Sequence, residues 1–268
     1  MTQTQLGDSI NIANANIKNR LFKSAMSEQL GDKLHNPTSG LANLYETWSA
    51  GECGLLVTGN VMISRTALGE PKNVVLDEKS DLNSFKAWAA SSKKHGSSVW
   101  MQLNHPGKQI PKFLAKEPVA PSAIALGSGL EASFAKPRAL EEHEIESIIQ
   151  AFAHSARLAK ETGFDGVQIH GAHGYLVSQF LSPRHNQRDD KWGGSLENRM
   201  RFVTEVYHAI RREVGEDYPI GIKLNSADYS KGGFSHEEAM QVVQQLSVLG
   251  LDLIEISGGT YESPSMVG

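Results

Sequence analysis

Three side chains that can donate or exchange protons lie within one six-residue stretch: His170, His173 and Tyr175. They follow a short apolar run, residues 164–169, at the point where a strand is expected to end. Ligands of α/β folds bind at that end of a strand. An imidazole donates a hydrogen bond without carrying a charge, so the histidine pair predicts hydrogen bonding to a substrate oxygen.

A metal site is the other chemistry that two histidines suggest. Their i, i+3 spacing differs from the His-Glu-x-x-His spacing of zinc hydrolases, and only Asp228 or Glu255 could be imagined as a third ligand. We therefore expect no metal, and a metal-dependent barrel hydrolase ranks last among the candidate functions. Cys53 is the only cysteine, which excludes an internal disulfide and favours a reducing compartment.

The elements that position these residues alternate between strands and helices. This alternation indicates an α/β fold with a parallel sheet. Strands are expected at residues 20–26, 54–60, 98–104, 166–170, 220–225 and 252–257, and helices at 41–50, 81–94, 141–162, after the cap Ser195 and after the capping box of Ser235 and Glu238.

Polar residues share one face of four expected strands, and apolar residues share the other. Side chains alternate across a strand, so the polar face is common to all four, and a (β/α)8 TIM barrel gives it a place to converge. A hydrogen-bonded polar network without a ligand is the alternative. The polar positions are Gln102, Asn104, Gln168, His170, Lys223, Asn225, Glu255 and Ser257.

The strand count falls short of a closed barrel, which needs eight strands where we find six. We therefore expect one barrel domain over residues 1–268, truncated after strand six and incomplete at its C-terminus. The net charge of −4 and the lack of a basic run argue against a nucleic-acid partner. No apolar run is long enough for a bilayer, so we expect a cytoplasmic protein without a membrane partner. The sequence leaves open whether it forms a homo-oligomer.

Two further motifs have plain interpretations. The Gly-x-Gly-x-x-Ala match at residues 127–132 lacks the strand–turn–helix context of a dinucleotide site, so we regard it as a chance match. The dense polar cluster at residues 186–199 is expected to be scaffold that fixes a long loop onto the next helix.

Several motifs, taken in order, resemble the old yellow enzyme family of FMN-dependent NADH:flavin oxidoreductases. They are residues 18–26, 56–60 and 102–108, the His-Gly-Ala-His-Gly-Tyr run at 170–175 with its continuation to 202, and residues 223–229. The resemblance implies a barrel with FMN across its top. Carried over by motif, the flavin would be bound by Ser24, Ala25, Met26, Ser27, Gly59, Gln102 and Lys223.

The resemblance also implies a mechanism. NADH or NADPH would reduce FMN, and an α,β-unsaturated carbonyl compound would then take the place of the nicotinamide. His170 and His173 would hydrogen-bond the carbonyl oxygen, and Tyr175 would protonate the α-carbon. Lys223 would supply a cation beside flavin N1 and O2, where many relatives have arginine.

Two alternatives to this ene-reductase remain. A related flavin barrel enzyme could use the same site for dienoyl-CoA reduction or amine demethylation, or the chain could be a non-catalytic remnant. The intact histidines and Tyr175 argue against the remnant. Since the last two strands of the family barrel bind the FMN phosphate, we expect the 268-residue chain to bind FMN weakly or not at all.

Overall fold

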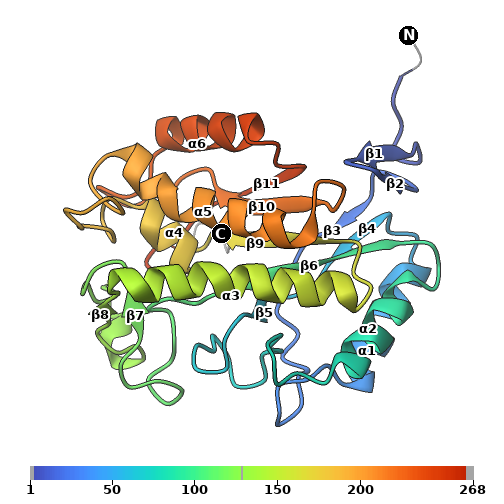
Figure 1. Cartoon of the computed structure of the whole chain (residues 1–268), viewed down its shortest axis with the longest axis horizontal. Coiled ribbons are helices and arrows are strands. Elements are labelled where there is room, and N and C mark those ends of the chain that lie inside the picture. Colours follow the sequence, from blue (N-terminus) through green and yellow to red (C-terminus); the bar gives the residue numbers. More distant parts are fainter. Residues whose placement is uncertain (1–2, 128, 264–268) are drawn as a thin grey trace.

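A curved parallel sheet dominates the computed structural model, which describes residues 3–127 and 129–263. Its main path runs β11-β10-β9-β6-β4-β3, and β5 (Val61–Met62) pairs with β6 beside it (Figure 1). The six strands are β3 (Phe22–Lys23), β4 (Leu55–Val57), β6 (Ser98–Asn104), β9 (Gly166–Gly171), β10 (Ile220–Asn225) and β11 (Leu253–Ser257).

All six expected strands are confirmed, and β6 and β10 have the predicted bounds. The first strand is the exception in length, since only Phe22 and Lys23 form ladder pairs, with Leu55 and Leu56 of β4. Past Lys23 the chain leaves the sheet and turns over its carboxyl edge, where it lines a cavity described below.

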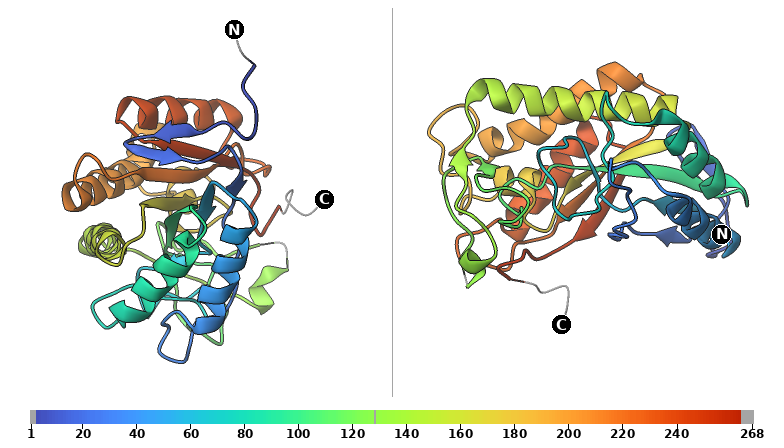
Figure 2. Two further views of the ribbon diagram at one scale, coloured as in Figure 1. Left: turned by 90° about the vertical axis from the view of Figure 1, so that its right-hand side faces the viewer. Right: turned by 90° about the horizontal axis from the view of Figure 1, so that it is seen from below.

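Helices cover the outer face of this sheet (Figure 2). The predicted helices are confirmed within a few residues, and one short helix, α4, was not predicted. They are α1 (Ser39–Ala50), α2 (Leu82–Lys93), α3 (Glu142–Glu161), α4 (Leu176–Leu181), α5 (Leu196–Val214) and α6 (His236–Val248).

Local hydrogen bonds begin the last two helices as the sequence predicts. The Ser195 side chain accepts from the Asn198 N–H at the start of α5. The Ser235 hydroxyl accepts from the Glu238 N–H, and the Glu238 carboxylate accepts from the Ser235 N–H, which completes the capping box of α6.

Two small ladders lie outside the main sheet. The hairpin of β1 (Ile10–Ile12) and β2 (Ala15–Ile17) precedes it, and β7 (Val119–Ala120) pairs with β8 (Arg138–Ala139) inside the long segment after β6. The region of the Gly-x-Gly match forms a single 3-10 turn at Leu130–Ala132, with residue 128 outside the described residues. No long helix starts there, which supports our interpretation of a chance match.

The hydrophobic core lies between the sheet and its helices. The apolar strand positions Met101, Val167, Ile169, Ile222 and Leu224 are fully buried in one cluster with residues of α3 and α5. Their polar neighbours therefore face the concave side, as strand parity predicts.

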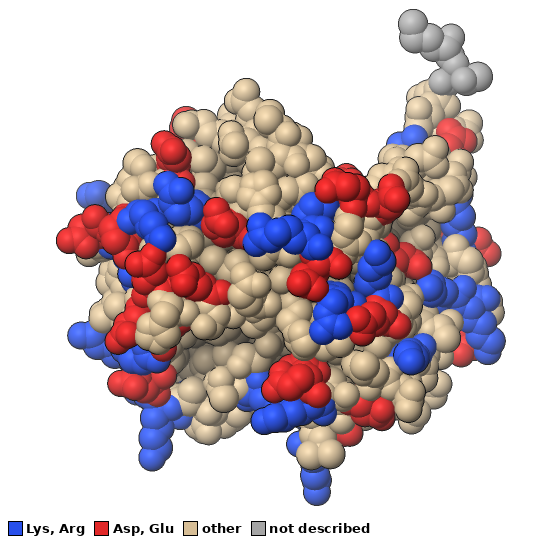
Figure 3. All heavy atoms as spheres, viewed as in Figure 1, with Lys and Arg blue, Asp and Glu red and all other residues tan. Residues whose placement is uncertain are grey.

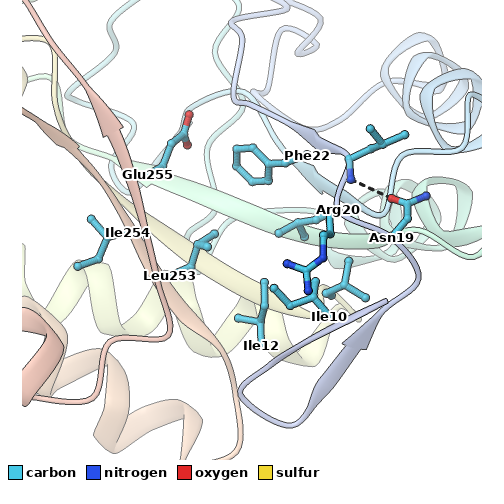
Figure 4. A pocket seen from close by; sticks show the side chains of 11 residues that line it. Ile10, Ile12, Asn19, Arg20, Phe22, Leu253, Ile254 and Glu255 are labelled. Atoms are coloured by element: carbon cyan, nitrogen blue, oxygen red, sulfur yellow. Dashed lines mark hydrogen bonds between the residues drawn. The ribbon is translucent and has the colours of Figure 1, made fainter. Parts of the chain in front are cut away.

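The sheet is open between β3 and β11, since no ladder joins these strands within the described residues. A cavity of about 320 Å³ lies at this opening. Most of its lining is apolar, including Ile10, Ile12 and Leu253 (Figure 4). The structure thus shows a six-stranded portion of a barrel wall. The polar side chains that line this cavity are Asn19, Arg20 and Glu255, and Glu255 also belongs to the polar face of the sheet.

The surface carries charges of both signs. On the face that Figure 3 shows, Lys and Arg are interspersed with Asp and Glu. Arg157 pairs with Glu161 within α3 and with Glu213 of the neighbouring helix α5. Among the described residues no helix is long and apolar enough to cross a membrane.

Candidate functional site

A cavity opens at the carboxyl ends of the strands, where the sequence predicts the site. Of the ten predicted site residues, eight line it, all except Ser24 and Gly59. Asn60 also lines it and was not predicted. The full lining is Ala25, Met26, Ser27, Asn60, Gln102, His170, His173, Tyr175 and Lys223.

The two remaining predicted residues lie close by. Ser24 accepts a hydrogen bond from the Lys223 ammonium at 3.0 Å, so it supports the lining from behind. Gly59 lines a neighbouring hollow with Ser27 and Asn60. The Gly59 N–H donates to the Tyr45 hydroxyl at 2.9 Å and is not available to a flavin, so the approach of its backbone to the ring edge stays a prediction.

A continuous chain of side-chain hydrogen bonds forms the floor of the cavity. The Gln102 amide donates to Gln168 at 2.8 Å, and Gln168 donates to Glu255 at 2.8 Å. Glu255 also accepts from Ser24 at 2.5 Å and pairs with Lys223 at 3.0 Å. These five residues come from five strands or their ends. The prediction that polar side chains of neighbouring strands meet on one face of the sheet is thus confirmed. Because the network is satisfied by its own members, only the cavity above it indicates a ligand.

Burial keeps both histidines neutral. It lowers the pKa of His170 well below the usual value, and the nearby His173 and Lys223 lower it further. Burial and Lys223 lower the pKa of His173 to about 4, against a smaller opposing effect of Glu255. The Ala172 N–H donates to Nδ1 of His170 at 3.3 Å. His170 therefore carries its proton on Nε2 and is a neutral donor at pH 7.

The backbone of His173 is held in an uncommon conformation. Its φ of 61° lies in the left-handed region, which costs a non-glycine residue on the order of 1 kcal/mol. Asn225 at the end of β10 accepts from the His173 N–H at 3.1 Å, and the Gln109 side chain donates to its carbonyl at 3.1 Å. Nε2 of the ring lies 2.7 Å from the Ser257 hydroxyl. The strained turn thus fixes the second imidazole beside the first, with ring centroids 5.1 Å apart.

Tyr175 completes this wall of the cavity. Its ring packs edge-on against His170, with centroids 4.8 Å apart, and its hydroxyl lies 2.9 Å from the Tyr261 hydroxyl. Burial raises the pKa of Tyr175 well above the usual value, and Tyr261 and Glu70 contribute to the rise. Tyr175 is therefore a protonated phenol at neutral pH.

The residues present fit the ring system of FMN in chemical character. Ala25 and Met26 offer apolar surface, and Met26 is 52% exposed. The Gln102 amide and the Lys223 cation lie on the same cavity, suited to a polar ring edge and to the negative charge of a reduced flavin. Ser27 donates to Glu70 through a short hydrogen bond. Its hydroxyl proton is thus already engaged, so the binding of a flavin by Ser27 stays a prediction.

The polar cluster at residues 186–199 is scaffold, as predicted. Asn186 donates to the carbonyls of Phe180 and Trp192. Arg188 pairs with Asp190 and also donates to the carbonyls of residues 121 and 140. Arg199 donates to the Leu181 carbonyl and pairs with Glu238. These bonds tie the long loop to α4, α5 and α6.

Three neighbours of the site were not predicted as site residues. Asn60 lies at the end of an expected strand, and Glu255 was noted only for its parity and as an imagined metal ligand. Tyr261 lies on the loop after β11 and gave no local signal. Its role is visible only because the fold brings it to Tyr175. Among the described residues no three His, Cys, Asp or Glu side chains gather in a way that could hold a metal.

A parallel sheet with a histidine pair, a tyrosine and a cation at its carboxyl end is the arrangement that the resemblance to flavin-linked barrel oxidoreductases implies. The family model described as the NADH:flavin oxidoreductase / NADH oxidase family matches residues 5–262. The chain belongs to this family, that of old yellow enzyme.

Relatives from fungi and bacteria support the assignment. The NADH-dependent flavin oxidoreductase iliE of Hypocrea jecorina is 39% identical over 93% of this chain and 66% of its own length. The NADH oxidase of Thermoanaerobacter brockii is 36% identical over 94% of this chain and 39% of its own length. The chain therefore spans less than two thirds of either relative.

Solved structures give the same fold. A 2-naphthoyl-CoA reductase in complex with 2-naphthoyl-CoA superposes with a TM-score of 0.92 at 32% identity, over 97% of this chain and 41% of that one. The old yellow enzyme homologue of Zymomonas mobilis superposes with a TM-score of 0.86 at 26% identity, over 97% of this chain and 77% of that one.

Proposed function

We propose that this chain carries the substrate site of an FMN-dependent ene-reductase. The site would take a small α,β-unsaturated carbonyl compound, with NADH or NADPH as reductant. The observation that carries the proposal is the set of two neutral imidazoles and a protonated phenol on one cavity, with Lys223 beside His170 on the neighbouring strand. Ala25, Met26, Gln102 and Lys223 would hold the flavin ring, which when bound supplies the hydride chemistry.

The two histidines would act on the carbonyl oxygen. His170 offers its Nε2–H, and His173 offers Nδ1–H in the tautomer whose Nε2 accepts from Ser257. Two neutral donors stabilise the negative charge that develops on this oxygen, because they are already oriented and need no reorganisation. Tyr175 would deliver the proton to the α-carbon.

Replacement of both histidines by alanine tests the proposal. With FMN in excess, because we expect the chain to bind it weakly, His170→Ala together with His173→Ala should lower the rate of NAD(P)H oxidation with cyclohexenone by a hundredfold or more. This loss is on the order of the loss of an oxyanion donor. The exposed His143→Ala is the control and should leave the rate unchanged. An unchanged rate in the double variant would remove the carbonyl-binding role.

A second candidate is reduction of a conjugated acyl-CoA thioester by the same groups. It is favoured by the likeness to a reductase of 2-naphthoyl-CoA, whose fold matches this chain most fully among the structures compared above. Turnover with a dienoyl-CoA that exceeds turnover with cyclohexenone would select this candidate. We also propose that the protein acts in the cytoplasm on small molecules.

A further inference from the structure

The hydroxyl of Tyr175 is connected to a second phenol that reaches the surface. The two hydroxyl oxygens of Tyr175 and Tyr261 lie 2.9 Å apart. Tyr175 is 8% exposed, whereas Tyr261 is 39% exposed. A proton that reaches Tyr261 from water can therefore pass to the buried phenol through one hydrogen bond.

A buried general acid needs such a connection. Once Tyr175 has given up its proton, a phenolate remains in a site where burial raises the pKa of the group well above its usual value. The negative charge of Glu70 raises the pKa of both tyrosines, and the neutral ring of His170 offers Tyr175 no positive charge. A lone phenolate would be costly here, so the proton should be replaced as it leaves.

We propose that Tyr261 relays a solvent proton to Tyr175 while Tyr175 protonates the substrate, an inference that rests on the proposed function. The O–H bond of Tyr175 breaks as the C–H bond forms at the α-carbon. The O–H bond of Tyr261 breaks as that of Tyr175 is restored, and a solvent water molecule then protonates Tyr261 and leaves as hydroxide. One solvent proton enters the product, and no electrons move in the relay.

The loop after β11 holds Tyr261 in place. Its neighbour Thr260 forms a backbone bridge with His173. The ring of Tyr261 packs edge-on against Phe134, with centroids 6.0 Å apart, and against Tyr175 at the same separation. The phenol is thus held between the substrate wall and the long segment after β6.

A buried ion network anchors the next residue, Glu262. Its carboxylate accepts from His185 Nε2 at 2.9 Å and from the Gly127 N–H at 2.8 Å, and it pairs with Arg184. Burial opposes ionisation, yet these bonds lower the pKa of Glu262 to about 2. On its other side His185 accepts from the buried Lys108 ammonium at 2.8 Å. This anchor fixes the loop next to Tyr261, because Glu262 is bonded to His185, Gly127 and Arg184.

The hydrogen bond itself is tested without any cofactor. In the chain labelled with 13C at tyrosine Cζ, NMR follows the titration of Tyr261. Tyr175→Phe should move that titration to higher pH, because the bond to Tyr175 lowers the pKa of Tyr261. Tyr229→Phe is the matched control, since its hydroxyl also bonds a hydroxyl, that of Ser226, and should leave Tyr261 unchanged. An unchanged titration in Tyr175→Phe would overturn the relay.

Proton transfer is tested in the chain with FMN kept in excess, because we expect weak binding, and protein-free FMN is the blank. Tyr261→Phe should leave flavin reduction by NADH within twofold of wild type and slow reoxidation by cyclohexenone at least tenfold. The reoxidation rate is also measured in mixtures of H2O and D2O and plotted against the deuterium fraction of the solvent. This plot should be curved for wild type and Tyr229→Phe, where more than one proton moves, and linear for Tyr261→Phe. A merely structural role would not change the shape of this dependence.

The outcomes separate the two proposals. Unchanged reoxidation in Tyr261→Phe, or an equal loss in both half-reactions, overturns the relay and leaves the ene-reductase standing. If wild-type chain is reduced by NADH but passes no hydride to cyclohexenone or a dienoyl-CoA, the proposed function falls and the relay falls with it.

Discussion

Burial holds His105 and His173 neutral, since it lowers the pKa of each to about 4. In the unfolded chain a histidine takes up a proton near its ordinary pKa of about 6.5. Between these values the unfolded chain binds more protons than the folded one. The contribution to stability is therefore fully present above about pH 6.5 and is lost as the pH falls toward 4.

This linkage gives a prediction at the residue scale. The free energy of unfolding, measured with urea, should fall by about 2 kcal/mol per buried histidine between pH 7.5 and pH 5. His105→Asn should make this pH dependence shallower, whatever its effect on stability at pH 7.5. The exposed His143→Asn is the control. An equal pH dependence in wild type and His105→Asn would contradict the assignment.

The site residues were predictable where the strands carry them. Strand parity alone placed Gln102, Lys223 and Glu255 on one face, and the structure joins them in one hydrogen-bonded chain through Gln168 and Ser24. Tyr261 could not be found in this way. It lies 86 residues from Tyr175 on a loop without periodicity, so only tertiary folding reveals the contact.

At the scale of elements, the cap of α6 offers a clean test. Ser235→Ala removes the acceptor for the Glu238 N–H and should lower the free energy of unfolding by about 1 kcal/mol. Ser247→Ala in the same helix is the matched control, because its hydroxyl bonds only the Val243 carbonyl one turn back. Urea denaturation of both variants measures the difference. Equal stability of the two variants would show that the cap contributes nothing.

Helices and strands whose apolar residues recur at regular spacing were predicted, and short elements were not. The alternation of β6 and β10 gave their bounds, and the apolar stripe of α3 gave its length. All residues of α4 (Leu176–Leu181) are buried, so no polar face marks it as a helix. The ladders β1–β2 and β7–β8 have two or three residues in each strand, too few for a pattern to stand out.

At the scale of the whole molecule, the gap between β3 and β11 concerns the cofactor. Five of the seven predicted flavin residues line one cavity, and no phosphate site was identified by motif in this sequence. We therefore expect the 268-residue chain to retain little FMN through gel filtration. The same chain extended by two βα units that would complete the eight-stranded barrel should retain it in proportion to protein. Stoichiometric yellow flavin on the unextended chain would contradict this expectation.

The floor of the cavity also sets an order of events during folding. Ser24 and Glu255 bond each other across 231 residues, and Lys223 reaches Ser24 across 199. Closing such long loops costs conformational entropy before any contact compensates for it, so they tend to form late. A ribosome must therefore deliver β11 before the residues that follow β3 find their partners. A ligand that requires this floor binds only the finished molecule, and its binding reports that folding is complete.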